Sequence, residues 1–460
     1  MSERITIPGL SGDDQAALDS LWEVLQGRAA RNQMRQRRYD GKHAFRELGI
    51  STPPHLRHFG AVLGWPAKAV DMLADLCVPE GVVSPGVDLD ALGVTEQWHR
   101  NDMQLQLMGA QRLSLISGVA WLVATLGGPG EPDVVWTVKD ALNGTGSWRP
   151  GVRELDAFLS ITDRDDDGHP TGLVLYRPGY TITATKDRGH WSYDRAEFAL
   201  DRVPVEPVSY RPDPWRRYGR SRITREVCYL TDAAARTLVR SEVSAEFYSY
   251  PQRYALGVTE DDFTNPDGTQ QDRWQAIMGT VWAIGRDDSG ELPSVGQFPA
   301  STQQPHMDQL GVLAQTFAGA TGIPVSSLGV GMQQSNPTSA EAYVTARQDL
   351  IGTARAAMRT WGSAYRRSMA TAVELLHGSV PAELWSASVD WDDPAKLPAS
   401  TAADGLLKVT QALPWLADTE AAIDMLQLDE AQTAQLKADR RRARTATMLD
   451  ALLQGDDDGN

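Results

Sequence analysis

The spacing of apolar residues predicts a protein that opens with a helix, continues as β-structure and ends largely in helices. Over residues 11–38 the apolar positions share one helical face, and Ser11 precedes them as the expected N-cap. A second helical stretch is expected over residues 96–117. The face of the first helix consists of Leu18, Leu21, Trp22 and Leu25.

After Gly118 the pattern changes to β-rich runs, first over residues 119–123 and 134–138. Residues 158–208 are also predicted to be β-structure, because runs of β-branched and aromatic residues are divided by turn signals such as Pro178-Gly179. Prolines then recur, which predicts a boundary near residues 205–215. These prolines are Pro204, Pro207, Pro212 and Pro214.

Beyond that boundary the chain is predicted to be mainly helical, with a first helix over residues 221–250 that ends before Pro251. Residues 251–302 are irregular and rich in turn signals, and a shorter helix is expected over residues 303–320. The segment that follows, residues 321–337, is rich in glycine, serine and glutamine and is predicted to be a loop.

The longest predicted helix begins at a capping box, Thr338 to Glu341, and stops at Gly378. It would be more than about 50 Å long. Such a helix needs either its own domain or neighbouring subunits to cover its apolar stripe. We expect this stripe, together with those of the two preceding helices, to be buried by copies of the chain packed side by side around an axis. Residues 399–453 are again predicted to be helical. The stripe consists of Leu350, Ala354, Met358, Trp361, Tyr365, Met369, Ala372 and Leu376.

Composition narrows the class of protein. With 460 residues the chain is long for one core, so two or three packed regions are expected. The net charge of -16 argues against tight, sequence-reading binding of nucleic acid, because that affinity comes from neutralising phosphates. Cys77 and Cys228 make no metal or redox spacing and are expected to be buried in a reduced protein.

No membrane segment is expected either. The N-terminus has no apolar signal-peptide core, and the longest apolar stretch, residues 113–126, is shorter than the roughly 20 residues that span a bilayer. We therefore expect a soluble protein.

The sequence offers few catalytic patterns. Residues 163–168 (Asp-Arg-Asp-Asp-Asp-Gly) copy the start of an EF-hand loop, but Val174 stands where the loop needs its bidentate glutamate, so a polar hairpin is the better interpretation. A phosphate-binding glycine loop, a His-Glu-x-x-His helix and a Gly-x-Ser-x-Gly elbow are all missing from the sequence. We therefore predict no enzyme, no metal and no cofactor.

Two basic clusters and one histidine pair remain. The clusters are interpreted as solvated helix faces, ahead of a nucleic-acid contact. For the second cluster, ion pairs with neighbouring subunits are an equal reading. His55 and His58 are interpreted as a surface turn. The clusters are Arg28, Arg31, Arg35, Arg37 and Arg38 in the first helix, and Arg440, Arg441, Arg442 and Arg444 near the C-terminus.

Four collinear motifs resemble the portal proteins of tailed double-stranded-DNA bacteriophages of the siphophage type. The first motif, Arg38-Tyr39-Asp40-Gly41-Lys42-His43, resembles an early turn of these proteins. The others are Gly219-Arg220-Ser221-Arg222-Ile223, residues 318–324 with 336–342, and Trp391-Asp392-Asp393-Pro394. Together they extend over most of the chain in the family's order.

The resemblance implies an α+β, helix-rich portal fold. It places a mixed α/β wing at residues 1–215, a first stem helix at 216–250, a clip at 251–302 and a second stem helix at 303–320. A tunnel loop would follow at 321–338, then the long helix and a return to the wing at 339–398, and a helical crown at 399–460. These divisions are expectations from the resemblance.

The resemblance also implies a ring of twelve subunits at one capsid vertex, with double-stranded DNA passing through it. The expected partners are the terminase large subunit, the major capsid or scaffolding protein and a head-tail adaptor. The expected location is the virion, after assembly in the host cytoplasm. Two other readings remain: another head-tail adaptor or minor capsid protein, or a metal-dependent nuclease using the aspartates at 163–167.

The loop that the resemblance places at the constriction carries no formal charge. We predict that such a loop touches a moving duplex without holding its phosphates; the other reading is a solvent-exposed linker with no role toward DNA. The loop consists of Val330, Gly331, Met332, Gln333, Gln334 and Ser335.

Overall fold

The computed structural model describes residues 4–43, 61–248, 253–256, 294–297, 302–330, 345–396, 399–428 and most of 432–445. It confirms the expected mixture of helices and strands. The chain forms two compact units. The layered unit comprises Met1–Met34, Val70–Arg222 and Ser335–Asn460, and the helix-pair unit comprises Arg35–Ala69 and Ile223–Gln334.

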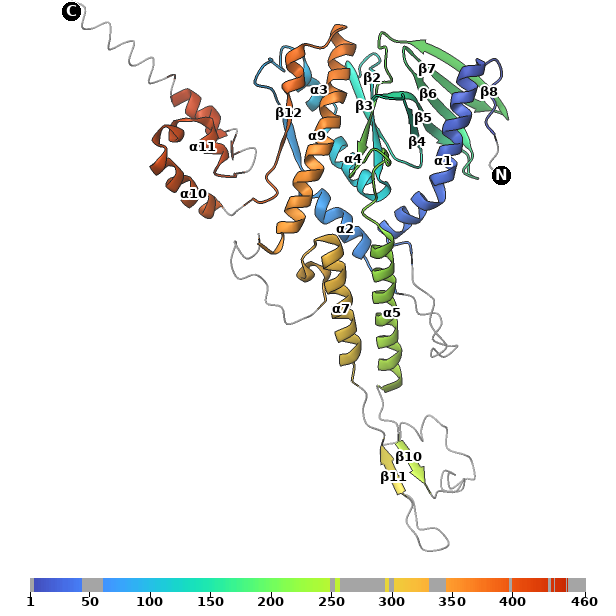
Figure 1. The fold of residues 1–460 in the computed structure, drawn as a ribbon, viewed down its shortest axis with the longest axis vertical. Coiled ribbons are helices and arrows are strands. Elements are labelled where there is room, and N and C mark those ends of the chain that lie inside the picture. Colours follow the sequence, from blue (N-terminus) through green and yellow to red (C-terminus); the bar gives the residue numbers. More distant parts are fainter. Residues whose placement is uncertain are drawn as a thin grey trace, which may run out of the picture. The chain divides into compact units, whose positions relative to one another are not determined.

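The layered unit contains two main antiparallel sheets, which confirm the strands predicted between residues 119 and 208 (Figure 1). One sheet has five strands in chain order, and the other has three strands in the order β3-β2-β9. The five are β4 (Gly144–Trp148), β5 (Leu155–Arg164), β6 (Pro170–Arg177), β7 (Tyr180–Asp187) and β8 (His190–Glu197). The three are β2 (Val119–Leu126), β3 (Val134–Lys139) and β9 (Val205–Ser209).

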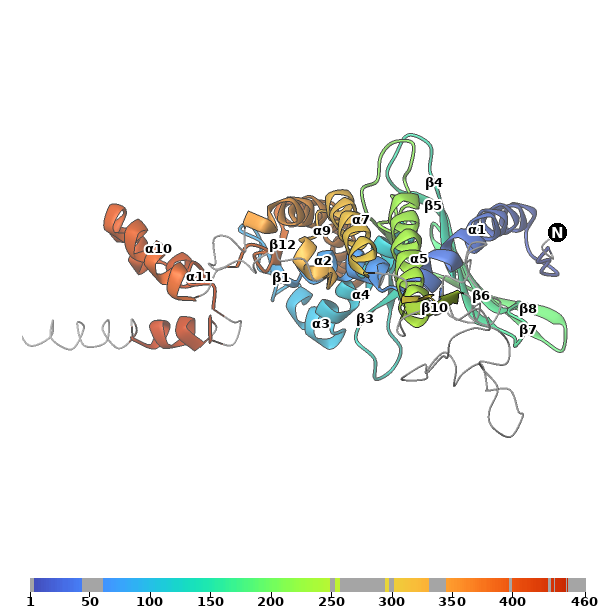
Figure 2. The same ribbon diagram turned by 90° about the horizontal axis from the view of Figure 1, so that it is seen from below.

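In the five-stranded sheet, both faces of β5 and β6 are buried, because these strands alternate two apolar sets, whereas the edge strand β8 is exposed. One set packs against α1 (Gly12–Tyr39), which lies along the sheet (Figure 2). The other set, including Phe158 and Tyr176, packs against Val119, Trp121 and Val123 of β2. Asp14 N–H donates to Ser11 Oγ at 3.2 Å, so the predicted N-cap of α1 is confirmed.

The outer face of the three-stranded sheet is covered by α4 (Met103–Ser117) and α9 (Gln348–His377). Trp136 Nε1 of β3 donates to Ser368 Oγ of α9 at 2.9 Å, and Tyr365 Oη donates to the carbonyl of Leu107 in α4 at 3.3 Å. The layered unit is therefore built as helix, sheet, sheet and helices.

This packing overturns one expectation about the long helix. The stripe from Leu350 to Ala372 is buried against α4, the three-stranded sheet and β12 (Ser388–Trp391) of the same chain, so α9 needs no neighbouring copy to cover it. As described, the helix has 30 residues, about 45 Å. Gly378 ends it with a φ of 74°, as expected, and the capping box at 338–341 lies outside the described residues.

The single helix predicted over residues 96–117 is wrong. It is divided into α3 (Val94–Arg100) and α4, because Asp102 adopts a left-handed φ of 47°. Asn101 explains the break: its Nδ2 donates to the Val134 carbonyl, and its Oδ1 accepts from the N–H of Trp136. The side chain thereby holds the edge of β3, a long-range contact that periodicity does not register.

The prolines predicted a boundary near residues 205–215. In the structure, the strand β9 occupies the first part of this stretch. Pro207 lies opposite Trp121 on an edge strand of the sheet, where a residue without an N–H is tolerated. Smaller elements complete the unit: β1 (Pro79–Val83), which pairs with β12, and the short helices η4 (Ala382–Ser386), α10 (Ala399–Ala412), η5 (Pro414–Asp418) and α11 (Glu420–Asp424). The predicted C-terminal helical tail is thus confirmed where it is described, though it is broken into pieces.

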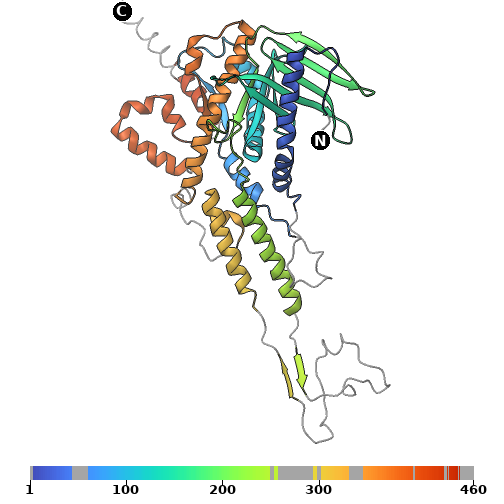
Figure 3. The ribbon, with the colours of Figure 1, turned by 45° about the vertical axis from the view of Figure 1, so that its right-hand side comes forward.

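The helix-pair unit confirms the two shorter helices predicted after residue 220. α5 (Arg225–Tyr248) and α7 (Gln304–Thr321) lie side by side (Figures 1 and 3). Between them in the chain, β10 (Arg253–Leu256) and β11 (Ser294–Gln297) pair antiparallel. A hydrogen bond of 2.8 Å joins the hydroxyl of Ser241 to the amide of Gln303.

The base of this pair is closed by aromatic packing. Trp65 opens α2 (Trp65–Ala74), and its ring lies 5.0 Å from that of the fully buried Phe317. A short helix, η3 (Val325–Leu328), follows α7. Across the described residues of both units, every helix is too short or too polar to cross a lipid bilayer.

Candidate functional site

Of the six residues predicted for the channel constriction, the structure describes one. Val330 is half-buried and follows Gly329, whose φ of 70° ends η3. Gly331, Met332, Gln333, Gln334 and Ser335 lie outside the described residues, so the assignment of this loop stays a prediction.

The motif before α5 forms a close backbone crossing. Gly219 has a φ of 68°, and a Cβ there would lie 2.5 Å from the carbonyl oxygens of Gly118 and Tyr210. Two residues later, the Ser221 hydroxyl donates to the carbonyl of Ile116. Only glycine fits at the crossing, and the serine ties the end of the layered unit to α4. The motif therefore has a local structural reason.

The early turn motif carries an ion pair. Arg38 makes two hydrogen bonds of 2.9 Å to the Asp232 carboxylate of α5, and this contact raises the pKa of Arg38. His43 lies 3.7 Å from the same carboxylate, but burial lowers its pKa. The turn that contains Gly41, with a φ of 67°, holds this arrangement.

The prediction that the first basic cluster is a solvated helix face is therefore wrong for part of the cluster. Besides Arg38, Arg28 is half-buried, with its guanidinium 3.3 Å from the centre of the Tyr218 ring, and burial lowers its pKa. The second cluster is likewise engaged within the chain. Arg440 donates to the carbonyls of Ala417 and Thr419, and Arg441 pairs with Glu420 at 3.3 Å.

The predicted polar hairpin at residues 163–168 is confirmed as the turn between β5 and β6. The carboxylate of Asp165 accepts a hydrogen bond from the His169 N–H at 2.7 Å. Arg164 fixes the base of the hairpin through Asn143 Oδ1 and the Leu142 carbonyl, both at 3.2 Å. Within the described residues, His, Cys, Asp and Glu side chains form no group of three that would hold a metal ion.

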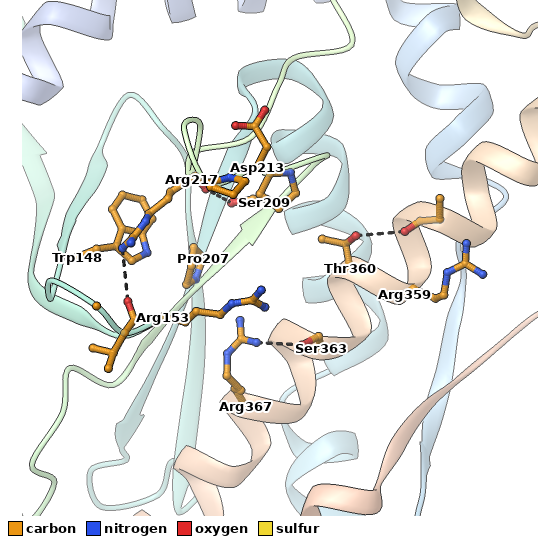
Figure 4. A pocket seen from close by; sticks show the side chains of 15 residues that line it. Trp148, Arg153, Pro207, Ser209, Asp213, Arg217, Arg359, Thr360, Ser363 and Arg367 are labelled. Carbon is orange, nitrogen blue, oxygen red and sulfur yellow. Dashed lines mark hydrogen bonds between the residues drawn. The ribbon is translucent and has the colours of Figure 1, made fainter.

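One feature that the sequence did not indicate is a cavity of about 790 Å³ in the layered unit, lined by the β4–β5 loop, β9, the loop after it and α9 (Figure 4). Four arginines lie around it: Arg153, Arg217, Arg359 and Arg367. Arg367 pairs with Glu206 at 2.8 Å, and burial raises the pKa of that carboxyl group.

A second unpredicted feature is Trp215, which is 96% exposed beside this cavity's lining residues Pro214 and Arg217. Its loop is held in place, because the N–H groups of Trp215 and Arg216 donate to Asp213 Oδ1 at 2.9 and 2.8 Å. Arg220 pairs with the other oxygen of Asp213 at 2.8 Å, and this hydrogen bond lowers the pKa of the aspartate. The available signal was a tryptophan that follows two prolines, Pro212 and Pro214, in a predicted turn.

The helix pair exposes apolar side chains as well. Tyr229 on α5 is 66% exposed and Val312 on α7 is 60% exposed, whereas Val227, Leu230 and Ala314 on the same helices are buried. Each helix therefore has one covered apolar face and further apolar residues on its open side.

Comparison with known proteins now defines the class. Residues 18–445 match the family described as phage portal protein, SPP1 Gp6-like, and the chain belongs to that family. The resemblance seen in the four motifs is thereby confirmed.

Among curated relatives, the portal proteins of Mycobacterium phages L5 and D29 are each 24% identical to this chain over 380 residues, covering 81% of it and 77% of the relative. Solved structures with a looser likeness include the virion of a native gene transfer agent particle (TM-score 0.40, 15% identity, 79% of this chain and 90% of that one). Another is the neck of the native particle computed with C12 symmetry (TM-score 0.43, 13% identity, 76% and 85%).

Proposed function

We propose that this chain is the subunit of a ring-shaped portal at one capsid vertex, through which double-stranded DNA enters and leaves the head. The observation that carries this proposal is the family match over residues 18–445, which spans both units of the fold. The role is structural: the ring shapes a channel, and the energy for DNA movement comes from a separate motor.

The arrangement of the chain supports an assignment of parts. The layered unit holds most of the proposed wing (1–215), and α5 and α7 correspond to the proposed stem helices at 216–250 and 303–320. The segment between them, 251–302, is the proposed clip, and 321–338 the tunnel loop. We assign 339–398 to the long helix and its return to the wing, and 399–460 to the crown.

The proposed partners follow from this role. A ring of twelve copies would dock the terminase large subunit during packaging, contact the major capsid or scaffolding protein, and later hold a head-tail adaptor for ejection. Assembly would occur in the host cytoplasm, and the finished ring would reside in the virion.

The channel proposal rests on charge. Twelve chains at -16 each repel phosphate, and the loop from Val330 to Ser335 has no charged residue. Deleting residues 331–335 should leave ring assembly intact and impair genome packaging, measured as packaged DNA per particle. Unchanged packaging in that variant would remove the loop from the channel.

Electron microscopy of the purified chain tests the proposal as a whole. We expect rings with a central hole that is wide enough for a duplex. A folded chain that remains a single copy at high concentration, and that is absent from the vertex of phage particles, would overturn the portal assignment.

A further inference from the structure

The cavity beside α9 has an excess of positive charge. Arg367 is paired with Glu206, and the acidic lining residue Asp213 is paired with Arg220. Arg153, Arg217 and Arg359 are exposed and have no carboxylate partner among the described residues. Arg153 and Arg217 therefore stand at one concave site without compensation, and Arg359 lines its rim with its side chain directed away from them (Figure 4), which favours an anionic occupant.

The walls of the cavity favour a protein segment over nucleic acid. Trp148 and Pro207 line it (Figure 4), as does Pro212, and the almost fully exposed Trp215 follows the lining residue Pro214 in the chain. Exposed tryptophans held in a fixed loop are typical of residues that dominate protein interfaces. A cavity of about 790 Å³ accepts a few side chains but is far too small for a duplex.

The same chain carries a matching acidic element, the hairpin between β5 and β6. Asp163, Asp165, Asp166 and Asp167 are all exposed on it, and Arg164 holds its base. Because these carboxylates lie next to one another, they repel each other, and a positively charged partner surface would relieve this repulsion.

Within one copy the hairpin cannot reach the cavity. The cavity residues Trp148 and Arg153 flank the first residue of β5, Leu155, and the hairpin begins at its last, Arg164. A strand of this length holds its two ends roughly 30 Å apart. A second copy has no such restriction, and complementary patches at opposite ends of a subunit are what a closed, head-to-tail ring requires.

We propose that the acidic hairpin of one copy inserts into the arginine cavity of the next copy, with Trp215 packing against the inserted segment. This proposal rests on the proposed ring function, and in it the hairpin and the cavity are the surfaces through which neighbouring copies close the ring. The charge pairing sets the register between neighbours, and the tryptophan supplies apolar contact area.

Cross-linking tests the geometry directly. The double variant Asp166→Cys with Arg153→Cys, in the full-length chain, should give a disulfide-linked ladder of oligomers under oxidising conditions, which a reductant collapses. The unmodified chain is the control, because Cys77 is buried and Cys228 half-buried, so it should give no ladder. Rings without a ladder in the double variant would overturn this contact while leaving the portal proposal standing; an unmodified chain that forms no rings would overturn both.

Charge reversal tests the energetics. Asp165→Lys with Asp167→Lys, or Arg153→Glu with Arg359→Glu, should each weaken ring assembly at least about tenfold, and combining the four changes should restore it. Asp187→Lys and Lys408→Glu, which reverse exposed charges elsewhere, are the matched controls and should assemble normally. Failure of the combined variant to recover would contradict the pairing.

Trp215→Ala should also weaken assembly, whereas Trp415→Ala, another exposed tryptophan, should not. If the arginine variants instead assemble normally and change only the retention of DNA in particles, the cavity binds phosphate and the contact between copies is wrong.

Discussion

The long helix α9 and the pair α5–α7 have similar apolar stripes in sequence but different surroundings. The stripe of α9 is covered by a sheet and a second helix of its own chain, with Trp361 fully buried. Among the described residues, α5 and α7 pack on each other, on Trp65 around Phe317 and on Arg38 through Asp232, and they leave Tyr229 and Val312 exposed. Helical periodicity is the same signal in both cases. It predicts that one face of each helix is buried, but it does not predict which part of the protein buries that face.

The difference suggests a division of labour. The layered unit buries two apolar clusters and the stripe of α9 within one chain and so should be stable as a single copy, although Trp215 on its surface is exposed. The helix pair has exposed apolar side chains that a neighbouring copy would cover. This comparison is tested by substitutions that change either the stability of a single copy or the assembly of several copies, but not both.

The largest effect is expected at Trp361. Replacing it with alanine removes a fully buried ring and should lower the free energy of unfolding by about 3–5 kcal/mol, measured by chemical denaturation. Arg359→Ala, two residues away and exposed, is the control and should change stability by less than about 0.5 kcal/mol. A loss below about 1 kcal/mol at Trp361 would mean that its own chain does not cover α9.

A smaller effect is expected where α1 meets α5. Arg38→Ala leaves the Asp232 carboxylate without its two hydrogen bonds and should cost about 1–3 kcal/mol. A double-mutant cycle with Asp232→Ala, followed by thermal unfolding, isolates the pair. The neighbouring exposed Arg37→Ala serves as the control, and equal losses for Arg37 and Arg38 would contradict the assigned role.

Substitutions on the exposed side of the helix pair should affect assembly and leave the stability of a single copy unchanged. Tyr229→Ala with Val312→Ala should leave the stability of a single copy within about 0.5 kcal/mol. Ring formation, followed by mass measurement across a concentration series, should shift to higher protein concentration because the ring loses apolar contact area. Thr316→Ala on α7, also exposed, should assemble normally; unchanged assembly of the double variant would place the neighbour's contact elsewhere.

The smallest effect on stability at neutral pH is expected from the ionisation of the Cys77 thiol. Burial raises its pKa from 9.0 to about 12, so the folded thiol should resist modification at pH 8 until the chain unfolds. Since the folded state keeps this proton to higher pH than the unfolded state, its contribution to stability is present below about pH 9 and is lost as pH rises toward 12. Rapid labelling of both cysteines in the native protein would show that Cys77 is accessible. Cys228 was expected to be buried but is only half-buried, so slow labelling there is no contradiction.

Much of the local structure followed from the sequence alone. The N-cap at Ser11, the stop at Gly378, the β5–β6 hairpin and the helices on either side of the 251–302 insert are all decided by neighbouring residues, through capping, turn chemistry and periodicity. The collinear motifs likewise pointed to the family, because short backbone crossings such as the one at Gly219 restrict residue type strongly.

Contacts between residues far apart in the chain were decided only by tertiary structure. Asn101 breaks a helix in order to hold β3, and β2 offers a second apolar face that covers α9. The arginine cavity joins residues 153, 217 and 359, whose spacing follows no period. Apolar burial is non-directional, so a sequence pattern states which face seeks a partner, while the partner itself is chosen by how the sheets and helices pack.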